Sequence, residues 1–346
     1  MQPTSNHNIP TITVVMPVYN VSAYVERCLL SVMRQKKPAD ECIIVDDASP
    51  DDSIAKCERL IAEYTGPTRF NILHHKEQRG LSAARNTGTD AATSDYIYYL
   101  DSDDEMTIDC LEKLSKPLLN DDSIEMVMGN NIKDRSKLHL SKWQQFVVFN
   151  YDNWIEDTPA ELYTNEDLRK WFFKGKHKRP PYVWNKLLKL DFIKSHQLYN
   201  KDGLLYEDRL WSYYLMRHLN HAAFVKDVTY LYHLRPDSIV TSTKYEDILL
   251  HRGLFYVEYA KNVVSGENIE EAEFYSKGFC DYYVDAHYEP NYQYAYKIFH
   301  RELSDGHHRK MLFVLSLTHH LGKNNVGRQL FKFLRQTHAL ILRIYR

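Results

Sequence analysis

The sequence holds three carboxylates in four residues, Asp101-Ser102-Asp103-Asp104, directly after the apolar segment Tyr96–Leu100. Carboxylates this close repel one another, so a cation or solvent must relieve the repulsion. A divalent metal with phosphate oxygens as co-ligands would do so, because Mg²⁺ is commonly held by one or two carboxylates, substrate phosphates and water. Mn²⁺ suits oxygen ligands equally. The alternative is a solvated acidic turn that caps the next helix.

Three further polar clusters follow apolar runs earlier in the chain, namely Pro17-Val18-Tyr19-Asn20, Asp46-Asp47 and Gly80–Asn86. The acidic pair exceeds what local structure requires, because Ser49 suits a helix N-cap and Pro50 the first helical position. A carboxylate at Asp46 or Asp47 would accept a hydrogen bond from an imide N–H such as that of uracil. The alternative is an Asx-turn.

Arg85 lies on the polar side of a predicted helix, Leu81–Thr93, which is made largely of small residues. Ala84, Gly88 and Ala91 share the opposite side, so this helix can approach a sheet closely. The guanidinium would bind diphosphate oxygens or brace the acidic run, unless Arg85 is an ordinary surface arginine. The chain contains neither a Walker A sequence nor GxGxxG, so P-loop and dinucleotide sites have no support.

Two candidates lie further along the chain. Glu207 and Asp208 open a predicted helix over Glu207–Leu219, where acids usually only stabilise the helix dipole. His233 follows a predicted strand over Ala222–Leu231, and a lone histidine is more often structural than a ligand.

Strand and helix patterns alternate over the first 130 residues or so. The predicted strands are Thr11–Met16, which Pro17 ends, Cys42–Val45, Phe70–Leu73, Tyr96–Leu100 and Glu125–Met128; the helices begin near Ser22 and Ser49 and cover Leu81–Thr93 and Thr107–Leu118. This alternation predicts βαβ units and a mostly parallel α/β sheet. Ligands of such sheets bind outside the carboxyl ends of the strands, so the polar clusters should converge on one cleft.

The alternation fades past about residue 135, where helices are predicted over Glu166–Phe173 and Glu207–Leu219. From about Asp247 the chain looks mainly helical and forms a candidate separate appendage. The segment Leu330–Tyr345 mixes apolar with basic side chains, and such a helix can lie on an anionic membrane surface. It could equally pack on the protein or on a second copy.

The composition fits a globular protein of about two structural units, with 346 residues and a net charge of −2. That charge gives no electrostatic reason to expect nucleic acid as a partner. The five cysteines form no CxxC pair and are interpreted as reduced thiols of a cytoplasmic protein. We expect neither a signal peptide nor a membrane-spanning helix.

Seven segments together resemble the family 2 inverting glycosyltransferases with the GT-A fold. They are VVMPVYNVSAYVERCLLSV, IIVDDASPDDS, RGLSAARNTG, YIYYLDSDD, VWNKLLKLDFI, LYEDRLW and YLYHLRPDSI. Their order and spacing are specific, although each alone is not. The resemblance implies a Rossmann-like GT-A domain over residues 1–242, with a nucleotide-binding half at about 11–130 and an acceptor half at about 131–242. Residues 243–346 would be a helical C-terminal region.

The resemblance also implies roles for single residues. The nucleotide-sugar site would comprise Pro17, Tyr19, Asn20, Asp46, Asp47, Gly80, Arg85, Asp101 and Ser102. Asp101 and Asp103 match the DxD metal pattern of the family, and His233 falls where some members supply a further metal contact. Asp208 matches the catalytic base, with Glu207 as its neighbour.

The implied reaction is metal-dependent, inverting transfer of one sugar from a nucleotide-diphosphate sugar, with UDP favoured, to a hydroxyl of a glycan or lipid-linked glycan. Surface polysaccharide synthesis in the cytoplasm, with possible contact to the inner face of the membrane, would be its setting. The QxxRW motif of processive synthases is absent from the sequence, which favours a single transfer. Two alternatives remain: a nucleotidyltransferase, although the segment after the first strand lacks a Gly-rich basic loop, and a non-catalytic sugar-nucleotide or glycan-binding module.

Overall fold

The computed structural model describes residues 9–134, 158–174 and 181–235, with isolated positions at 247, 251, 254–256, 258, 259 and 297. The chain divides into two compact units, Met1–Gly203 with Glu207–Ser242, and Leu204–Tyr206 with Thr243–Arg346. The helices expected after residue 243, the basic segment Leu330–Tyr345 and Cys280 lie almost wholly outside the described residues.

The first unit is built on one mixed sheet with strand order β3-β2-β1-β4-β8-β6-β9-β5, and β7 pairs with β9. The strands are β1 Ile12–Val18, β2 Glu41–Asp46, β3 Arg69–His74, β4 Tyr96–Tyr99, β5 Glu105–Met106, β6 Met126–Asp134, β7 Glu161–Leu162, β8 Lys186–Lys189 and β9 Ala222–His233. The helices are α1 Val25–Met33, α2 Ser53–Glu63, α3 Leu81–Ala91, α4 Cys110–Ser115, α6 Asn165–Lys174, α7 Leu190–Ser195 and α8 Glu207–His218, with a 3₁₀ turn at Pro117–Leu119.

The α/β class is as predicted, but the prediction of a mostly parallel sheet holds for only half of the strand pairings. Strands β1 to β4 pair in parallel, as does β6 with β9. Strand β8 runs antiparallel between β4 and β6, and β5 and β7 run antiparallel to β9. Strand β8 is almost wholly buried, and a short buried run reveals neither its direction nor, on its own, its identity as a strand.

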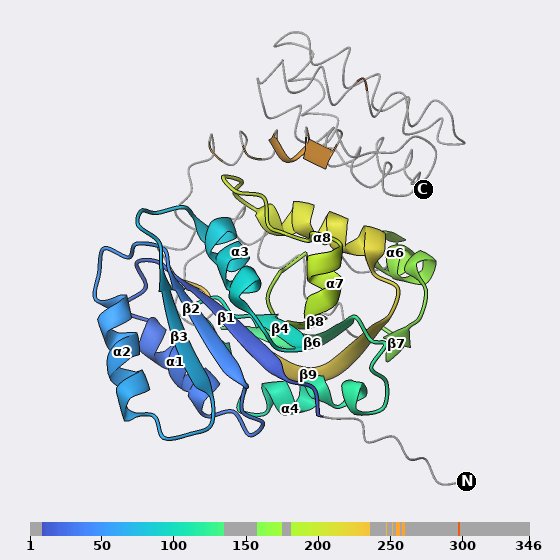
Figure 1. Ribbon diagram of the computed structural model, residues 1–346. Coiled ribbons are helices and arrows are strands. Elements are labelled where there is room, and N and C mark those ends of the chain that lie inside the picture. The colour runs from blue at the N-terminus through green and yellow to red at the C-terminus, as the bar shows by residue number, and fades with distance from the viewer. Residues whose placement is uncertain are drawn as a thin grey trace, which may run out of the picture. The chain divides into compact units, whose positions relative to one another are not determined.

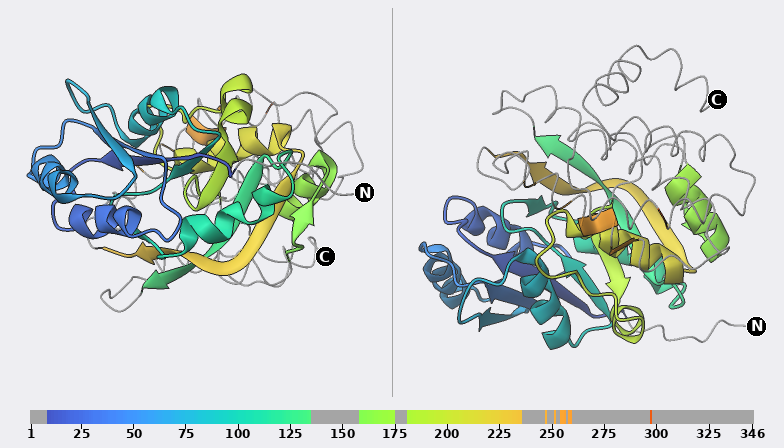
Figure 2. Two further views of the ribbon diagram at one scale, coloured as in Figure 1. Left: turned by 60° about the horizontal axis from the view of Figure 1, so that its bottom comes forward. Right: turned by 90° about the horizontal axis from the view of Figure 1, so that it is seen from above.

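Helices cover both faces of the sheet (Figure 1). Helices α1, α2 and α4 lie on one face, where Val14, Met16 and Cys28 belong to one buried cluster. Helices α3, α6, α7 and α8 lie on the other, where Val15 and Trp211 belong to a second. The long strand β9 curves beside β6, and their register shifts around Asn130 (Figure 2).

The predicted apolar face of α1 is confirmed, since Val25, Cys28, Leu29 and Val32 are all buried. The four described cysteines, Cys28, Cys42, Cys57 and Cys110, are buried free thiols, as expected. Among the described residues, no helix is both long enough and apolar enough to span a membrane.

The prediction that Pro17 ends the first strand is wrong. Strand β1 continues to Val18, and Pro17 pairs with Val45 of β2. The pairing of β1 with β4 ends earlier, at Val15. A proline is tolerated here because the side of β1 that faces β4 is already unpaired at Pro17, so the missing N–H costs no hydrogen bond between strands.

The predicted start of the second helix is also wrong, because α2 begins at Ser53. The Asp46 Oδ1 atom accepts a hydrogen bond from the Ser49 amide at 2.8 Å, which closes a turn. The Ser49 hydroxyl accepts from the Asn20 amide at 3.0 Å instead of capping a helix.

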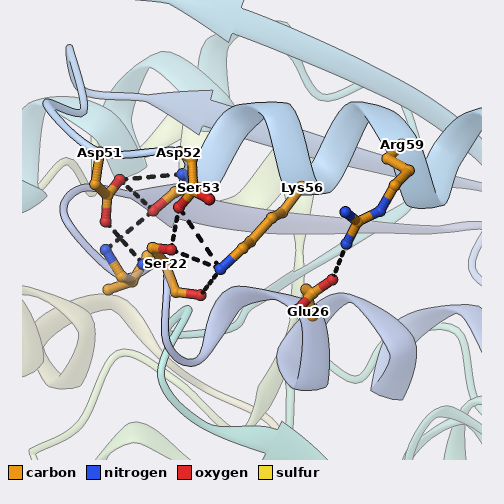
Figure 3. A network of polar contacts seen from close by, with 8 residues as sticks. Ser22, Glu26, Asp51, Asp52, Ser53, Lys56 and Arg59 are labelled. Atoms are coloured by element: carbon orange, nitrogen blue, oxygen red, sulfur yellow. Dashed lines mark hydrogen bonds and ion pairs between the residues drawn. The ribbon is translucent and has the colours of Figure 1, made fainter.

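The loop after β1 and the start of α2 are joined by the polar network of Figure 3. Asp51 accepts the Ser22 amide at 2.8 Å, and Lys56 Nζ donates to the Ser22 carbonyl at 2.9 Å. Arg59 pairs with Glu26 of α1. These contacts fix the positions of the loops that carry Tyr19 and Asp47.

Candidate active site

The polar clusters Asp46-Asp47 and Gly80–Asn86 meet at Asp47, whose carboxylate holds the segment before α3 in place. Asp47 Oδ1 accepts the Arg79 amide at 2.8 Å, and Oδ2 accepts the Gly80 amide at 2.7 Å. Its Oδ1 also lies 2.7 Å from Nδ1 of His75, whose side chain is 6% exposed. Gly80 has φ of +90°, a conformation that a side chain disfavours. Asp47 is only 2% exposed, and both of its oxygens accept hydrogen bonds from this loop.

Asp46 forms the turn that the sequence left open as an alternative. Besides accepting from Ser49, its Oδ2 lies 2.9 Å from His74 Nδ1. The cluster Pro17–Asn20 is more accessible than Asp47, since Tyr19 keeps 38% of its surface exposed. Asn20 adopts φ of +52°, which turns the chain after β1. Tyr19 therefore presents an accessible ring beside the carboxyl ends of β1 and β2.

Arg85 is not a surface arginine, because it is 2% exposed and bridges two carboxylates. Its Nη2 lies 2.6 Å from Asp101 Oδ1, and its Nη1 lies 2.5 Å from Glu207 Oε1. Burial alone would lower the pKa of Arg85, but the two carboxylates outweigh it and raise the pKa. The guanidinium thus joins the acidic loop after β4 to the start of α8.

The acidic loop is held by protein partners and is not a freely solvated turn. Asp103 Oδ2 lies 2.5 Å from Nε of Arg235, which follows β9. Asp104 is 1% exposed and accepts from the Tyr230 hydroxyl and the His233 amide, each at 2.7 Å. Burial, reinforced by the charge of Asp103, raises the pKa of Asp104 well above its ordinary value. Ser102 is buried within the same loop.

No group of three or more histidine, cysteine or acidic side chains able to hold a metal occurs in the described part of the chain. Asp101 and Asp103 nevertheless fit a magnesium-type ion, because such ions take one or two carboxylates and complete their coordination with phosphates and water. The His233 imidazole has its Nε2 2.8 Å from Glu105 Oε1. Its role as a metal ligand stays a prediction.

Asp208 carries a carboxylate oxygen, Oδ1, that is buried without a hydrogen-bond partner. Burial, followed by the charge of Glu207, raises the pKa of Asp208 from 3.8 to about 7. An acid that only stabilised a helix dipole would be solvated and have an ordinary pKa, so the dipole does not explain Asp208.

Sequence reasoning missed several charged residues here. Arg235 comes two residues after His233, within the segment YLYHLRPDSI that resembles the family, so both its position and its spacing could have marked it. Arg27 of α1 donates from Nη2 to the Asp103 carbonyl at 2.7 Å, and nothing in the helix pattern predicts that. Lys186 is buried in β8, where burial lowers its pKa to about 7 and the charge of Asp208 opposes that shift.

Similar proteins are glycosyltransferases. The family described as Glycosyl transferase family 2 matches residues 13–184. The putative glycosyltransferase EpsH of Bacillus subtilis (strain 168) is 30% identical over 256 residues, which are 72% of this chain and 67% of that protein. Glycosyltransferase GlyG of Streptococcus pneumoniae serotype 4 is 27% identical over 232 residues, covering 66% of this chain and 72% of that protein.

Among solved structures, S. aureus TarS 1–349 in complex with UDP-GlcNAc superposes with a TM-score of 0.70 at 18% identity. The match covers 94% of this chain and 92% of that one. The likeness confirms the expected Rossmann-like fold, with the mixed sheet described above.

Proposed function

Because this chain belongs to glycosyl transferase family 2 and is therefore a glycosyltransferase, we propose that it moves one sugar from a UDP-linked donor to a hydroxyl of a glycan or lipid-linked glycan, with inversion and with the help of a divalent cation. The observation that carries this proposal is Arg85, which holds Asp101 of the acidic loop and Glu207, the neighbour of Asp208, on one guanidinium. Leaving-group chemistry and proton removal thus share one site.

The choice of a UDP-linked donor is supported by the fold shared with TarS, whose solved structure contains UDP-GlcNAc. In this chain the exposed ring of Tyr19 is available for stacking on a base. Asp47 fixes the amides of Arg79 and Gly80, and so sets the loop that leads into α3. Pro17, Asn20, Asp46 and Ser102 complete the proposed donor site as backbone and turn residues.

The proposed cation would be held by Asp101 and Asp103. When bound, it supplies positive charge that stabilises the departing diphosphate. Arg85 contributes a second, permanent positive charge at the same loop and orients Asp101. His233 remains a predicted additional ligand.

Asp208 is the proposed general base. Its unpartnered Oδ1 would accept the proton of the acceptor hydroxyl as the oxygen attacks the anomeric carbon, while the bond to the diphosphate breaks. A pKa of about 7 suits this task, because a base works best when its pKa lies near the working pH. Attack from the face opposite the leaving diphosphate inverts the anomeric configuration.

Surface polysaccharide synthesis is the proposed setting. Relatives over shorter segments include a putative teichuronic acid biosynthesis glycosyltransferase of Bacillus subtilis, 36% identical over 107 residues, and chondroitin synthase of Pasteurella multocida, 31% identical over 125 residues. A cytoplasmic location with contact to the membrane through Leu330–Tyr345 rests on the sequence of that segment alone.

The direct test is incubation of the purified chain with UDP-glucose, UDP-galactose and their N-acetylhexosamine counterparts, with water or a panel of glycans as acceptor of the sugar and release of UDP as the measurement. We expect at least one donor to yield UDP, EDTA to stop the release, and Mn²⁺ or Mg²⁺ to restore it. Asp103→Asn should lose most of the release. Asp109→Asn is the matched control, because Asp109 pairs with Lys113 in α4 and lies outside the proposed site.

Release of pyrophosphate from UTP and a sugar 1-phosphate, with no release of UDP from the UDP-sugars, would support the nucleotidyltransferase alternative. Tight UDP-sugar binding with no turnover for any acceptor would support the non-catalytic module. Full activity in EDTA would exclude the proposed cation.

A further inference from the structure

Arg235 occupies one of the two carboxylates expected to bind the cation. Its Nε lies 2.5 Å from Asp103 Oδ2, and its guanidinium carbon lies 5.2 Å from the ring centre of Tyr24. The contact joins residues 132 positions apart in the sequence, so it depends on the placement of β9 beside the acidic loop. A monovalent cation of the protein thus lies where the proposed divalent cation would bind.

Arg235 differs in this respect from Arg85. The Arg85 side chain is 3% exposed and is fixed between Asp101 and Glu207, which belong to different parts of the fold. The Arg235 side chain is 18% exposed, and the Asp103 side chain is 20% exposed, so this pair is partly open to solvent. Arg85 is suited to a permanent role, whereas the Arg235 contact can be exchanged.

A guanidinium and a divalent ion on the same carboxylate repel each other, because like charges a few ångströms apart interact strongly at a partly buried site. Binding of the metal should therefore weaken the partly exposed contact of Arg235 with Asp103 more than that of Arg85 with Asp101, because Arg85 is buried and also held by Glu207. Guanidinium groups bind phosphate oxygens readily, so a diphosphate that arrives with the metal offers Arg235 a new partner.

We propose that Arg235 is an exchangeable placeholder, which neutralises Asp103 in the empty enzyme and passes to the donor diphosphate when the divalent cation takes its place. This inference rests on the proposed function, in which Asp103 is a metal ligand. It makes Arg235 a positioning residue that keeps metal alone from binding tightly and couples metal binding to donor binding. By thermodynamic linkage, metal and diphosphate must then strengthen each other's binding equally.

The test is titration of Mn²⁺ into the full chain, with free Mn²⁺ followed by electron paramagnetic resonance, in the absence and in the presence of saturating UDP. Arg235→Gln should bind Mn²⁺ about tenfold more tightly than wild type without UDP, since a charged hydrogen bond no longer competes. The gain in Mn²⁺ affinity that UDP provides should fall by about tenfold. Arg235→Lys keeps a cation and should stay closer to wild type.

Arg27→Gln is the matched control, because Arg27 contacts the Asp103 carbonyl and Glu105 but neither carboxylate of the proposed metal pair. Its Mn²⁺ affinity should change less than about twofold, as expected for a charge that acts only through its field. Arg235→Ala is measured alongside Arg235→Gln, so the result does not depend on the folding of one variant. Thermal melts identify any variant that fails to fold.

Asp103→Asn distinguishes a failure of the proposed metal site from a failure of the placeholder role of Arg235. If this variant still binds Mn²⁺ with UDP as wild type does, the proposed metal site is wrong and the placeholder fails with it. If Asp103→Asn abolishes Mn²⁺ binding, but Arg235→Gln and Arg235→Ala bind Mn²⁺ no more tightly than wild type without UDP, the placeholder alone is overturned.

Discussion

The parallel part of the sheet, β1 to β4, and the mixed part, β5 to β9, contribute to the site in different ways. In the parallel part, polar side chains stand where strands end, and neighbouring strand ends meet, as Asp47 meets Gly80. In the mixed part, Glu207 and Asp208 begin a helix, and Arg235 follows a long curved strand. Ion pairs connect the two parts, through Arg85 to Glu207 and through Asp103 to Arg235.

We infer that the two parts have different roles in the site. Strand ends provide a rigid, closely packed rim on which a donor can be held. The mixed part provides groups whose charge depends on the surroundings, above all Asp208, whose pKa is raised by burial. The comparison would fail if substitutions of Glu207 or Asp208 affected donor binding as much as substitutions in the parallel part.

The largest expected effect is that of Asp208→Asn, which removes the proposed base from the mixed part. Transfer should fall by about 10²- to 10⁴-fold, the usual contribution of a general base. UDP binding, measured by calorimetry, should remain near wild type because the parallel part is untouched. Asp191→Asn is the control, since Asp191 also lies in the first turn of a helix but is exposed. Near-normal turnover of Asp208→Asn would exclude the role.

The link between the two parts is tested by Arg85→Met. This variant leaves the carboxylates of Asp101 and Glu207 without their shared cation. The free energy of unfolding should fall by about 3–5 kcal/mol, as for other broken buried ion pairs. Arg59→Met breaks the exposed pair with Glu26 and should cost about 0–1 kcal/mol in the same urea titration. Equal losses for the two variants would mean that Arg85 does not connect the halves.

The pH dependence sharpens the assignment of Asp208. A base must be deprotonated, so kcat/KM should rise about tenfold per pH unit below pH 7 and level off above it. The sign for stability is opposite: a carboxyl pKa raised from 3.8 to about 7 means that the folded protein loses stability as pH rises through that window. Asp208→Asn should therefore be more stable than wild type at pH 8 but not at low pH. A flat rate profile between pH 5.5 and 8.5 would contradict the role of Asp208 as the base, and equal stability of the variant and wild type at pH 8 would contradict the raised pKa of Asp208.

The smallest expected effect concerns packing in the parallel part. A methyl group at Gly88 of α3 would overlap the Val15 side chain of β1. Gly88→Ala should lower the free energy of unfolding by about 1 kcal/mol, because overpacking outweighs the better helix propensity of alanine. In a Val15→Ala background, Gly88→Ala should lower the free energy of unfolding by less than it does in wild type. An equal loss in both backgrounds would mean that the close approach of α3 to the sheet does not cause the loss of stability.

The sequence by itself determined the strands and helices of the parallel part and the polar residues at their ends. The reason is that hydrophobic period and turn chemistry are local properties of the chain. It also determined family membership through the order of seven segments. It failed at Pro17 and Ser49, where strand pairing and a loop network override local preference.

Only the tertiary structure decided which charges meet. The Arg85–Glu207 and Asp103–Arg235 pairs join residues 122 and 132 positions apart, and their contact depends on the order and direction of strands in the mixed part. The raised pKa of Asp208 likewise comes from burial, which no local pattern encodes. Local chemistry therefore marked the candidates, while the long-range packing of the chain gave each carboxylate its partner or left it without one.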